Sequence, residues 1–252
     1  MKKCPSAVFF DLDDTLIRFP SRQAKALLLW QAARHLGTLF SERRPQWAVP
    51  FSVRVLAEAR RNLLHERAFV AHVAHKDVET SIAAHWTLCL QEALERLGRV
   101  EAHEHDIGRV SHAFFQGAFT QVALRTIHAF PAMVALVKEL GLQGVPLVLA
   151  TNPFVPRASV GQRLARAGLS FNNFQDATFA ENSRFLKPSA YYYEDILHRL
   201  GLPGRDVVMI GNDAVRDGAA RQVGIRTVIV SPHKGDEAAA KEARSFLWRS
   251  QT

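Results

Sequence analysis

Three carboxylates stand within four positions of the stretch VFFDLDDTL, at Asp11, Asp13 and Asp14, directly after an apolar run. Side chains alternate along an extended segment, so Asp11 and Asp13 are expected to point to one side and Asp14 to the other. Two carboxylates about 4 Å apart repel by roughly 4 kcal/mol at an effective dielectric constant near 20, so a shared site needs a cation or a shared proton. The alternative is that these residues and Thr15 form a turn or a helix cap.

Other polar groups follow apolar runs later in the chain. Thr151 and Asn152 end the run VPLVLAT, just before a predicted helix whose N-terminus would favour an anion. Lys187 stands directly before a proline at the start of another helical pattern, and Asp213 and Asp217 follow the run VVMIG. Taken singly, each of these residues is typical of a turn, a solvated surface or a helix cap.

The apolar runs predict the scaffold that would bring these groups together. Strands are expected at residues 6–11, 145–151, 176–180, 207–211 and 226–230. Helices are expected at about 156–168, 188–200 and 214–224, with a last one at about 236–249 that has Asp236 as its N-cap. This alternation predicts an α/β fold, with a Rossmann-like parallel sheet covered by helices on both faces. The polar groups would then lie at the carboxyl ends of strands, where open α/β sheets bind ligands.

Residues 20–126 have a different pattern, because they show helical periodicity and almost no strand alternation. They are inserted between the first expected strand and the rest of the sheet. We therefore predict two domains, a core of residues 1–19 and 127–252 and an inserted helical domain of residues 20–126, joined by linkers near 17–21 and 126–131.

The insertion contains two sets of residues with possible binding roles. His65, His72 and His75 have spacings that could place them on one helix face, so a second metal site stays open beside the interpretation that they are ordinary surface residues. Three residues of the first inserted helix are candidates for contact with a substrate's leaving group from their position alone: Arg22, Lys25 and Trp30.

The overall composition excludes several classes of protein. The chain has 252 residues and a net charge of +8, and the excess is shared evenly between residues 20–125 and the remainder, which indicates a solvated surface and no nucleic-acid partner. The apolar runs are far shorter than the roughly 20 residues that span a bilayer. Asp11 interrupts the N-terminal apolar stretch too early for a signal peptide, and Cys4 and Cys89 offer no metal-ligand spacing. We expect a cytoplasmic protein with free thiols and no membrane partner.

Taken together and in this order, the motifs resemble those of the haloacid dehalogenase (HAD) superfamily, in its phosphatase branch with a type-1 helical cap. The family's Asp-x-Asp-x-Thr motif is matched by Asp11, Asp13 and Thr15. Its later motifs, a hydroxyl residue ending a strand, a lysine and an acidic pair after a glycine, are matched at Thr151, Lys187, Asp213 and Asp217. One departure is Asn212, which follows the glycine directly where many members have Asp. Either Asn212 or Asp213 is therefore open as the metal ligand.

This resemblance implies a Mg²⁺-dependent phosphatase that hydrolyses a small phosphorylated metabolite through an aspartyl-phosphate. It implies Asp11 as the nucleophile, Asp13 as general acid and base, and Lys187 as the group that neutralises charge. The phosphoryl group would be bound by Thr151, Asn152 and Thr15, and the Mg²⁺ by Asp11, Asp13, Asp213 and Asp217. Asp13 favours phosphoryl chemistry over carbon–halogen cleavage, since a halide leaves without a proton.

Some alternatives stay open at this point. A phosphomutase of the same superfamily would use the same residues, and a non-catalytic member would bind a phosphorylated ligand or a protein. The sequence leaves the physiological substrate open, and it leaves both a monomer and a homodimer possible.

Overall fold

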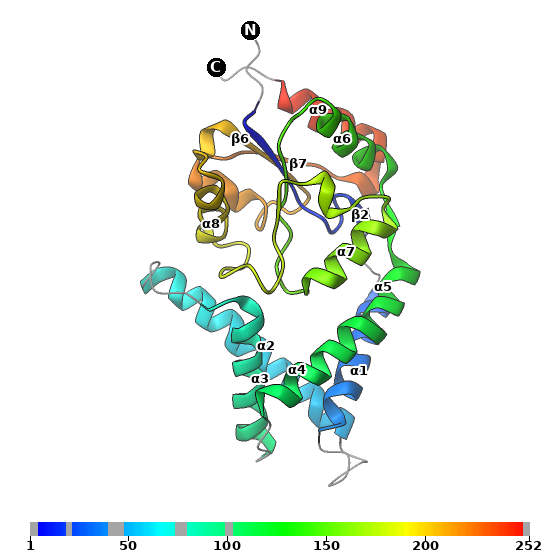
Figure 1. Cartoon of the computed structure of the whole chain (residues 1–252), viewed down its shortest axis with the longest axis vertical. Helices are drawn as coiled ribbons and strands as arrows, with labels where there is room; N and C mark the ends of the chain where they lie inside the picture. Colours follow the sequence, from blue (N-terminus) through cyan, green and yellow to red (C-terminus); the bar gives the residue numbers. More distant parts are fainter. Residues whose placement is uncertain (1–4, 19–21, 40–47, 74–79, 99–102, 249–252) are drawn as a thin grey trace.

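The fold is built on a parallel sheet of five strands with the order β5-β4-β1-β6-β7 (Figure 1). The computed structural model describes residues 5–18, 22–39, 48–73, 80–98 and 103–248. The strands of this sheet are β1 (Ala7–Phe10), β4 (Leu147–Leu149), β5 (Asp176–Ala177), β6 (Val207–Gly211) and β7 (Arg226–Ile229). Val8 of β1 is in register with Leu147 on one side and Val208 on the other, so the strand that leads to Asp11 is the centre of the sheet.

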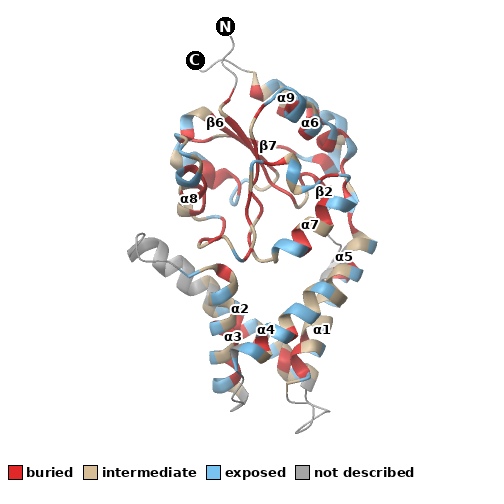
Figure 2. Ribbon diagram, in the orientation of Figure 1, coloured by how far each residue is buried: buried red, intermediate tan, exposed pale blue. Residues whose placement is uncertain are grey.

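Alternate residues of the central strands pack into two hydrophobic clusters, one on each face of the sheet. Val8 and Phe10 join the first cluster, whereas Ala7 and Phe9 join the second. The first face is covered by α6 (Pro131–Leu142), α7 (Arg157–Arg166) and α9 (Asp236–Leu247). The second face is covered by α8 (Ala190–Leu200) and η6 (Gly218–Val223). Both faces of the strands are therefore buried (Figure 2), and the predicted α/β fold with a parallel sheet is confirmed.

Two local expectations on the sheet side were wrong. The helix expected at about 214–224 is a 3₁₀ helix, η6 (Gly218–Val223). The N-cap residue of α9 is Gly235. The carboxylate of Asp236 accepts hydrogen bonds from the backbone N–H groups of Ala132 (2.7 Å) and Met133 (3.2 Å). Asp236 thus satisfies two of the unpaired N–H groups at the start of α6.

The described residues between β2 and β3 are mostly helical, as their periodicity predicted. This helical segment consists of α1 (Arg22–Gly37), α2 (Ala48–Val73), α3 (Ile82–Gly98), α4 (Glu104–Ala113), η3 (Phe114–Phe119) and α5 (Thr120–Thr126). Buried residues such as Val55, Cys89 and Leu94 give it a hydrophobic cluster of its own. Figure 1 shows these helices gathered on one side of the sheet. The division of the chain into two domains stays a prediction.

Among the described residues, backbone hydrogen bonds join the helical segment to the sheet side at two places, in addition to side-chain contacts such as that of Thr120 with Gln162. The first is the antiparallel pair β2 (Ile17–Arg18) and β3 (His128–Ala129), where the linkers were expected. The second is the start of α3, where the N–H groups of Ile82 and Ala83 donate to the carbonyl oxygens of Ser183 (2.8 Å) and Ala180 (2.9 Å). The segment is therefore held against the sheet at a second place, remote in sequence from the linkers.

The first turn of α3 has hydrogen-bond acceptors for all four of its leading N–H groups. Ile82 and Ala83 use the loop after β5, and the N–H of Ala84 donates to the hydroxyl oxygen of Ser81 at 3.2 Å. The N–H of the next residue donates to the carbonyl oxygen of Ser81 at 3.0 Å. Two of these four N–H groups thus donate to Ser81 at the start of the helix itself, and the other two donate to the loop after β5 on the sheet side of the molecule.

No helix in the described ranges has both the length and the apolar character that crossing a bilayer requires. Cys89 is buried and is not part of a disulfide, as expected, whereas Cys4 lies outside the described residues.

Candidate active site

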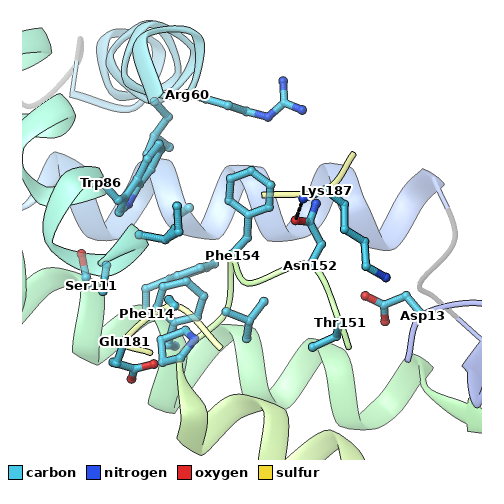
Figure 3. A pocket seen from close by; sticks show the side chains of 18 of the residues that line it. Asp13, Arg60, Trp86, Ser111, Phe114, Thr151, Asn152, Phe154, Glu181 and Lys187 are labelled. Atoms are coloured by element: carbon cyan, nitrogen blue, oxygen red, sulfur yellow. Dashed lines mark hydrogen bonds between the residues drawn. The ribbon is translucent and has the colours of Figure 1, made fainter. Parts of the chain in front are cut away.

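The carboxyl ends of β1, β4 and β6 meet beneath the helical segment, and a cavity of about 800 Å³ opens there. Asp11 follows β1, Thr151 follows β4 and Asn212 follows β6, and all three line the cavity together with Asp13 and Lys187. Figure 3 shows Asp13, Thr151 and Lys187 at one end of it. The expectation that these residues gather at the carboxyl edge of the sheet thus agrees with their positions.

Lys187 is the cation at the centre of this edge. Its Nζ lies 2.8 Å from Oδ1 of Asp11 and 2.6 Å from Oδ1 of Asp217, and its side chain is 1% exposed. Burial alone would lower the pKa of Lys187, but the carboxylates of Asp11 and Asp217 hold it well above its ordinary value. The backbone N–H of Lys187 also donates to Oδ1 of Asn152 at 3.2 Å. Lys187 therefore joins the loops that follow β1 and β6 through its ammonium group, and the loop that follows β4 through its backbone N–H.

Asp217 uses both of its carboxylate oxygens within the protein. Oδ1 pairs with Lys187, and Oδ2 accepts the backbone N–H groups of Asn212 and Asp213, each at 2.9 Å. A Cβ atom on Gly211 would lie 2.2 Å from Oδ2 of Asp217, so a glycine is required for this close approach. The carboxylate of Asp217 fixes the loop after β6 and the position of Lys187.

The second oxygen of Asp11 faces oxygen atoms. The hydroxyl group of Thr15 lies 3.3 Å from Oδ2 of Asp11 and 3.4 Å from Oδ1 of Asn212. Burial raises the pKa of Asp11 to about 6, an effect that Lys187 opposes and Asp217 supports. The site thus contains a buried carboxylate with one oxygen on an ammonium group and the other directed toward a hydroxyl and an amide oxygen.

Asp13 forms an ion pair with Arg163 of α7, a residue that the sequence reasoning missed. The side chain of Arg163 is 3% exposed, and its burial lowers its pKa to about 10, against the opposing carboxylate of Asp11. A signal was present in the sequence, because Val160, Arg163 and Leu164 share the buried face of α7. A cation at an otherwise apolar helical position indicates a buried anion facing it.

The turn after β1 differs from the extended segment that was expected. The strand ends at Phe10, and the carbonyl oxygen of Leu12 accepts the N–H groups of three residues at 15–17, so side-chain alternation does not extend beyond the strand. Asp14 has a φ of 58°, in the left-handed region, and its Oδ1 lies 2.7 Å from Nε2 of His233. This geometry suits the interpretation of Asp14 as a structural residue.

The contacts of Asp213 differ from those of Asn212. Oδ1 of Asp213 accepts the backbone N–H groups of Val215 (2.9 Å) and Arg216 (2.8 Å). Burial would raise the pKa of Asp213, but these two N–H groups keep it below its ordinary value. Asp213 therefore closes the turn after β6, while the amide oxygen of Asn212 is the one beside Thr15.

The helix that follows Thr151 already has an anion at its N-terminus. α7 begins at Arg157, whose N–H lies 3.0 and 3.2 Å from the carboxylate oxygens of Glu181. The expectation that this N-terminus is free for a bound anion was therefore wrong. Thr151 lines the cavity, and its carbonyl oxygen accepts the hydroxyl groups of Thr178 (2.7 Å) and Tyr192 (2.8 Å).

The donor atoms at the carboxyl edge fit Mg²⁺. The described residues contain no group of three or more His, Cys, Asp or Glu side chains placed to hold a metal ion by themselves. Mg²⁺ is usually bound through one or two carboxylates with waters and substrate phosphate. Oδ2 of Asp11 and Oδ1 of Asn212 supply hard oxygen atoms on either side of Thr15. A cation bound there would stabilise the buried carboxylate of Asp11 in addition to Lys187.

Of the residues in the inserted helices that were candidates for contact with a substrate or a second metal, the structure describes the side chain of one. Trp30 is 45% exposed, lies under the guanidinium of Arg34 at 4.8 Å, and is not among the residues that line the cavity. The side chains of Arg22, Lys25, His65 and His72, and the whole of His75, lie outside the described residues.

The raised pKa of Asp11 predicts a pH-dependent stability. The pKa of about 6 in the folded protein exceeds the ordinary 3.8, so the folded state keeps a proton that the unfolded chain loses, and stability falls as pH rises through this window. Asparagine does not titrate. We expect the melting temperature of Asp11→Asn, relative to the unchanged protein, to increase between about pH 4 and about pH 7 in EDTA. If the difference in melting temperature between the two proteins stays constant or decreases over this pH range, the raised pKa of Asp11 is contradicted.

Comparison with known proteins identifies related families and structures. A sequence model of the haloacid dehalogenase-like hydrolases matches residues 5–224. No relative was found among curated proteins. A 2-haloacid dehalogenase from Pseudomonas syringae pv. Tomato DC3000 is 23% identical, with 90% of this chain and 86% of that chain covered and a TM-score of 0.53. The putative HAD-hydrolase YfnB from Bacillus subtilis, solved bound to magnesium, is 18% identical, with 91% and 90% covered and a TM-score of 0.50. These two likenesses concern the fold.

Proposed function

Because the chain belongs to the haloacid dehalogenase-like hydrolase family, we propose that it is a Mg²⁺-dependent phosphatase that hydrolyses a small-molecule phosphomonoester through an aspartyl-phosphate. The observation that carries this proposal is the contact of Lys187 with Asp11 and Asp217 beside the cavity. This contact leaves the buried carboxylate of Asp11 at the edge of a cavity lined by hydroxyl, amide and carboxylate groups. This arrangement suits phosphoryl transfer, in which catalysis is mostly positioning and electrostatics.

Asp11 is the nucleophile of this proposal. Its carboxylate oxygen attacks phosphorus, the bond from phosphorus to the leaving oxygen breaks, and the phosphoryl group is carried on Asp11. Asp13 donates a proton to the leaving alcohol and later takes one from the water that attacks the phosphorus of the aspartyl-phosphate. The bond between phosphorus and the Asp11 oxygen then breaks, which releases phosphate and restores the carboxylate. Arg163 pairs with Asp13 and is proposed to position its carboxylate. Lys187 offsets the negative charge of Asp11 and of the phosphoryl group.

Asp11, the backbone carbonyl of Asp13 and Asn212 are proposed to hold the Mg²⁺. When bound, the ion would neutralise charge on the phosphoryl oxygens. The contacts favour Asn212 over Asp213, because the amide oxygen of Asn212 lies 3.4 Å from the hydroxyl group of Thr15, which is itself 3.3 Å from Oδ2 of Asp11. Asp217 is proposed as a positioning residue, since both of its oxygens already have donors.

Thr151 and Thr15 are proposed to bind the phosphoryl oxygens, and Asn152 to orient Lys187 through the hydrogen bond to its backbone. The helical segment, with the domain boundaries predicted from the sequence, is proposed to act as a cap that excludes bulk water. Its residues line the cavity opposite the carboxyl edge.

The experiment that tests this function is the hydrolysis of p-nitrophenyl phosphate and of acetyl phosphate with and without Mg²⁺. We expect phosphate release that EDTA abolishes and that added Mg²⁺ restores, because the two carboxylates and the phosphoryl group would otherwise repel one another. Ca²⁺ is a matched control, since it is larger and prefers longer bonds to oxygen.

Two outcomes would overturn the proposal. The first is the absence of Mg²⁺-dependent release from a broad panel of phosphomonoesters, which would favour a binding protein. The second is the release of chloride from 2-chloropropionate with no phosphatase activity, which would assign dehalogenation. Transfer of the phosphoryl group to a second alcohol in place of water would indicate a phosphomutase.

A further inference from the structure

The cavity extends from Asp11 to an apolar wall that the proposed chemistry does not use. Figure 3 shows Trp86 and Phe114 at one end, Asp13, Thr151 and Lys187 at the other, and Phe154 between them. The helical segment supplies most of this wall, with Leu36, Leu56, Trp86, Leu90, Phe114 and Phe115. A ligand whose phosphoryl group lies beside Lys187 would therefore place its other end among hydrocarbon and aromatic side chains.

The charges on this wall suit an apolar group on an anionic ester. Among the described lining residues of the helical segment, Arg60 carries the sole permanent charge, and none is acidic. Glu181, from the loop after β5, lies at the same end of the cavity beside Phe114 (Figure 3), and its carboxylate accepts the backbone N–H of Arg157. The polar side chains there are few, Thr87, Ser111, His112 and Gln116. A leaving group with many hydroxyls would give up water and find few partners, which is unfavourable, whereas hydrocarbon would gain from burial.

The aromatic part of the wall is preformed. Phe114, Phe115 and Phe119 belong to the π-helix η3, and their rings contact one another edge to face with centroids 5.0 to 6.0 Å apart. Mutual contacts of this kind fix the rings before a ligand arrives, so binding costs less side-chain conformational entropy.

We propose that the substrate is a phosphomonoester of a bulky apolar alcohol, with an alkyl or aryl group seated against Trp86 and Phe114. This inference rests on the proposed function for the phosphoryl end of the substrate. A cavity of about 800 Å³ accommodates such a group, since pockets for organic ligands of this size are typically 300–1,000 Å³. Sugar and nucleoside phosphates match the wall less well, because their hydroxyl groups would lie against rings.

The test is a series of n-alkyl phosphates from ethyl to octyl, measured with Mg²⁺. The intrinsic reactivity of these esters hardly changes with chain length, so differences in kcat/KM report binding of the alkyl group. We expect kcat/KM to increase about threefold to fourfold for each added methylene until the cavity is filled. Hydrolysis of all members at the same rate, or a preference for ethyl phosphate and glycerol phosphate, would overturn the inference while leaving the phosphatase function intact.

A matched pair of variants locates the effect. Trp86→Leu is expected to lower kcat/KM for octyl phosphate by about tenfold and to change that for ethyl phosphate by less than about twofold. Trp30→Leu, on α1 outside the cavity lining, is expected to change neither value. Equal effects of the two variants on both esters would contradict the placement of the alkyl group at Trp86.

A binding measurement needs no turnover and separates the two proposals. Octylphosphonate, which cannot be hydrolysed, is expected to change the tryptophan fluorescence of the unchanged protein and of Trp30→Leu, and to lose this effect in Trp86→Leu. Ethylphosphonate serves as the short control. Absence of a saturable response to octylphosphonate in a protein that hydrolyses acetyl phosphate would overturn the inference alone. Absence of hydrolysis of every ester would overturn the proposed function and the inference with it.

Discussion

Asp11→Asn is expected to lower kcat for p-nitrophenyl phosphate by on the order of 10⁴-fold or more, because an amide cannot form the aspartyl-phosphate. The fold should persist, since asparagine has nearly the same shape and Lys187 keeps its contact with Asp217. Steady-state kinetics and thermal denaturation measure the two effects separately. Borohydride reduction of protein quenched during turnover, followed by peptide mass spectrometry, should find homoserine at position 11 in the unchanged chain and none in the variant.

The matched control is Asp14→Asn, the same chemical change three positions along the chain. Asparagine tolerates the positive φ of this position, and its amide can still bond to His233. We expect Asp14→Asn to keep its activity within about threefold, because Asp14 borders the cavity but its carboxylate pairs with His233 and has no part in the proposed phosphoryl transfer. Full activity in Asp11→Asn, or homoserine at position 13, would show that Asp11 is not the nucleophile.

Lys187→Met is expected to lower the free energy of unfolding of the metal-free protein by about 3–5 kcal/mol, because breaking a buried ion pair leaves uncompensated charge. Two carboxylates, of Asp11 and Asp217, would lose their shared ammonium group while staying buried. Activity should be lost as well, since charge on the nucleophile would no longer be offset. Chemical denaturation in EDTA measures the stability, and Lys138→Met on the exposed face of α6 is the control, with a change within about 0.5 kcal/mol.

A second substitution distinguishes charge from packing in this result. Asp217→Asn added to Lys187→Met removes one of the two unpaired carboxylates and should recover part of the lost stability. The comparison needs the free energy of unfolding of Asp217→Asn alone. If Asp217→Asn lowers this free energy equally in the unchanged protein and in Lys187→Met, the two residues do not interact as their 2.6 Å contact implies.

The sequence predicted the strands well because their signal is local. Runs such as VVMIG are apolar at every position, as strands buried on both faces must be, and the polar residues after them could be assigned to one edge. The same reasoning placed Asp11, Thr151 and Lys187 around one cavity. It depended only on where apolar runs end.

Pairings between distant parts of the chain were beyond this kind of reasoning. Arg163 meets Asp13 across 150 residues, and Asp236 meets the start of α6 across 104. Nothing in local spacing says which anion a buried arginine will face. Asp236 was assigned to its own helix because N-cap preferences are local rules, whereas the neighbouring α6 offered unpaired N–H groups at closer range.

The start of α3 has a consequence for how this molecule tolerates change. The hydrogen bonds of Ile82 and Ala83 to the loop after β5 join main chain to main chain, so almost any side chain at these positions leaves them in place. Proline at either position would be the exception, because it lacks the donor. A scan of alanine substitutions would therefore leave both hydrogen bonds in place, and Ile82→Ala would report only the lost packing of its buried side chain. The side chains of the surrounding cavity wall can therefore change to suit new ligands, while these backbone hydrogen bonds keep α3 in place against the loop after β5.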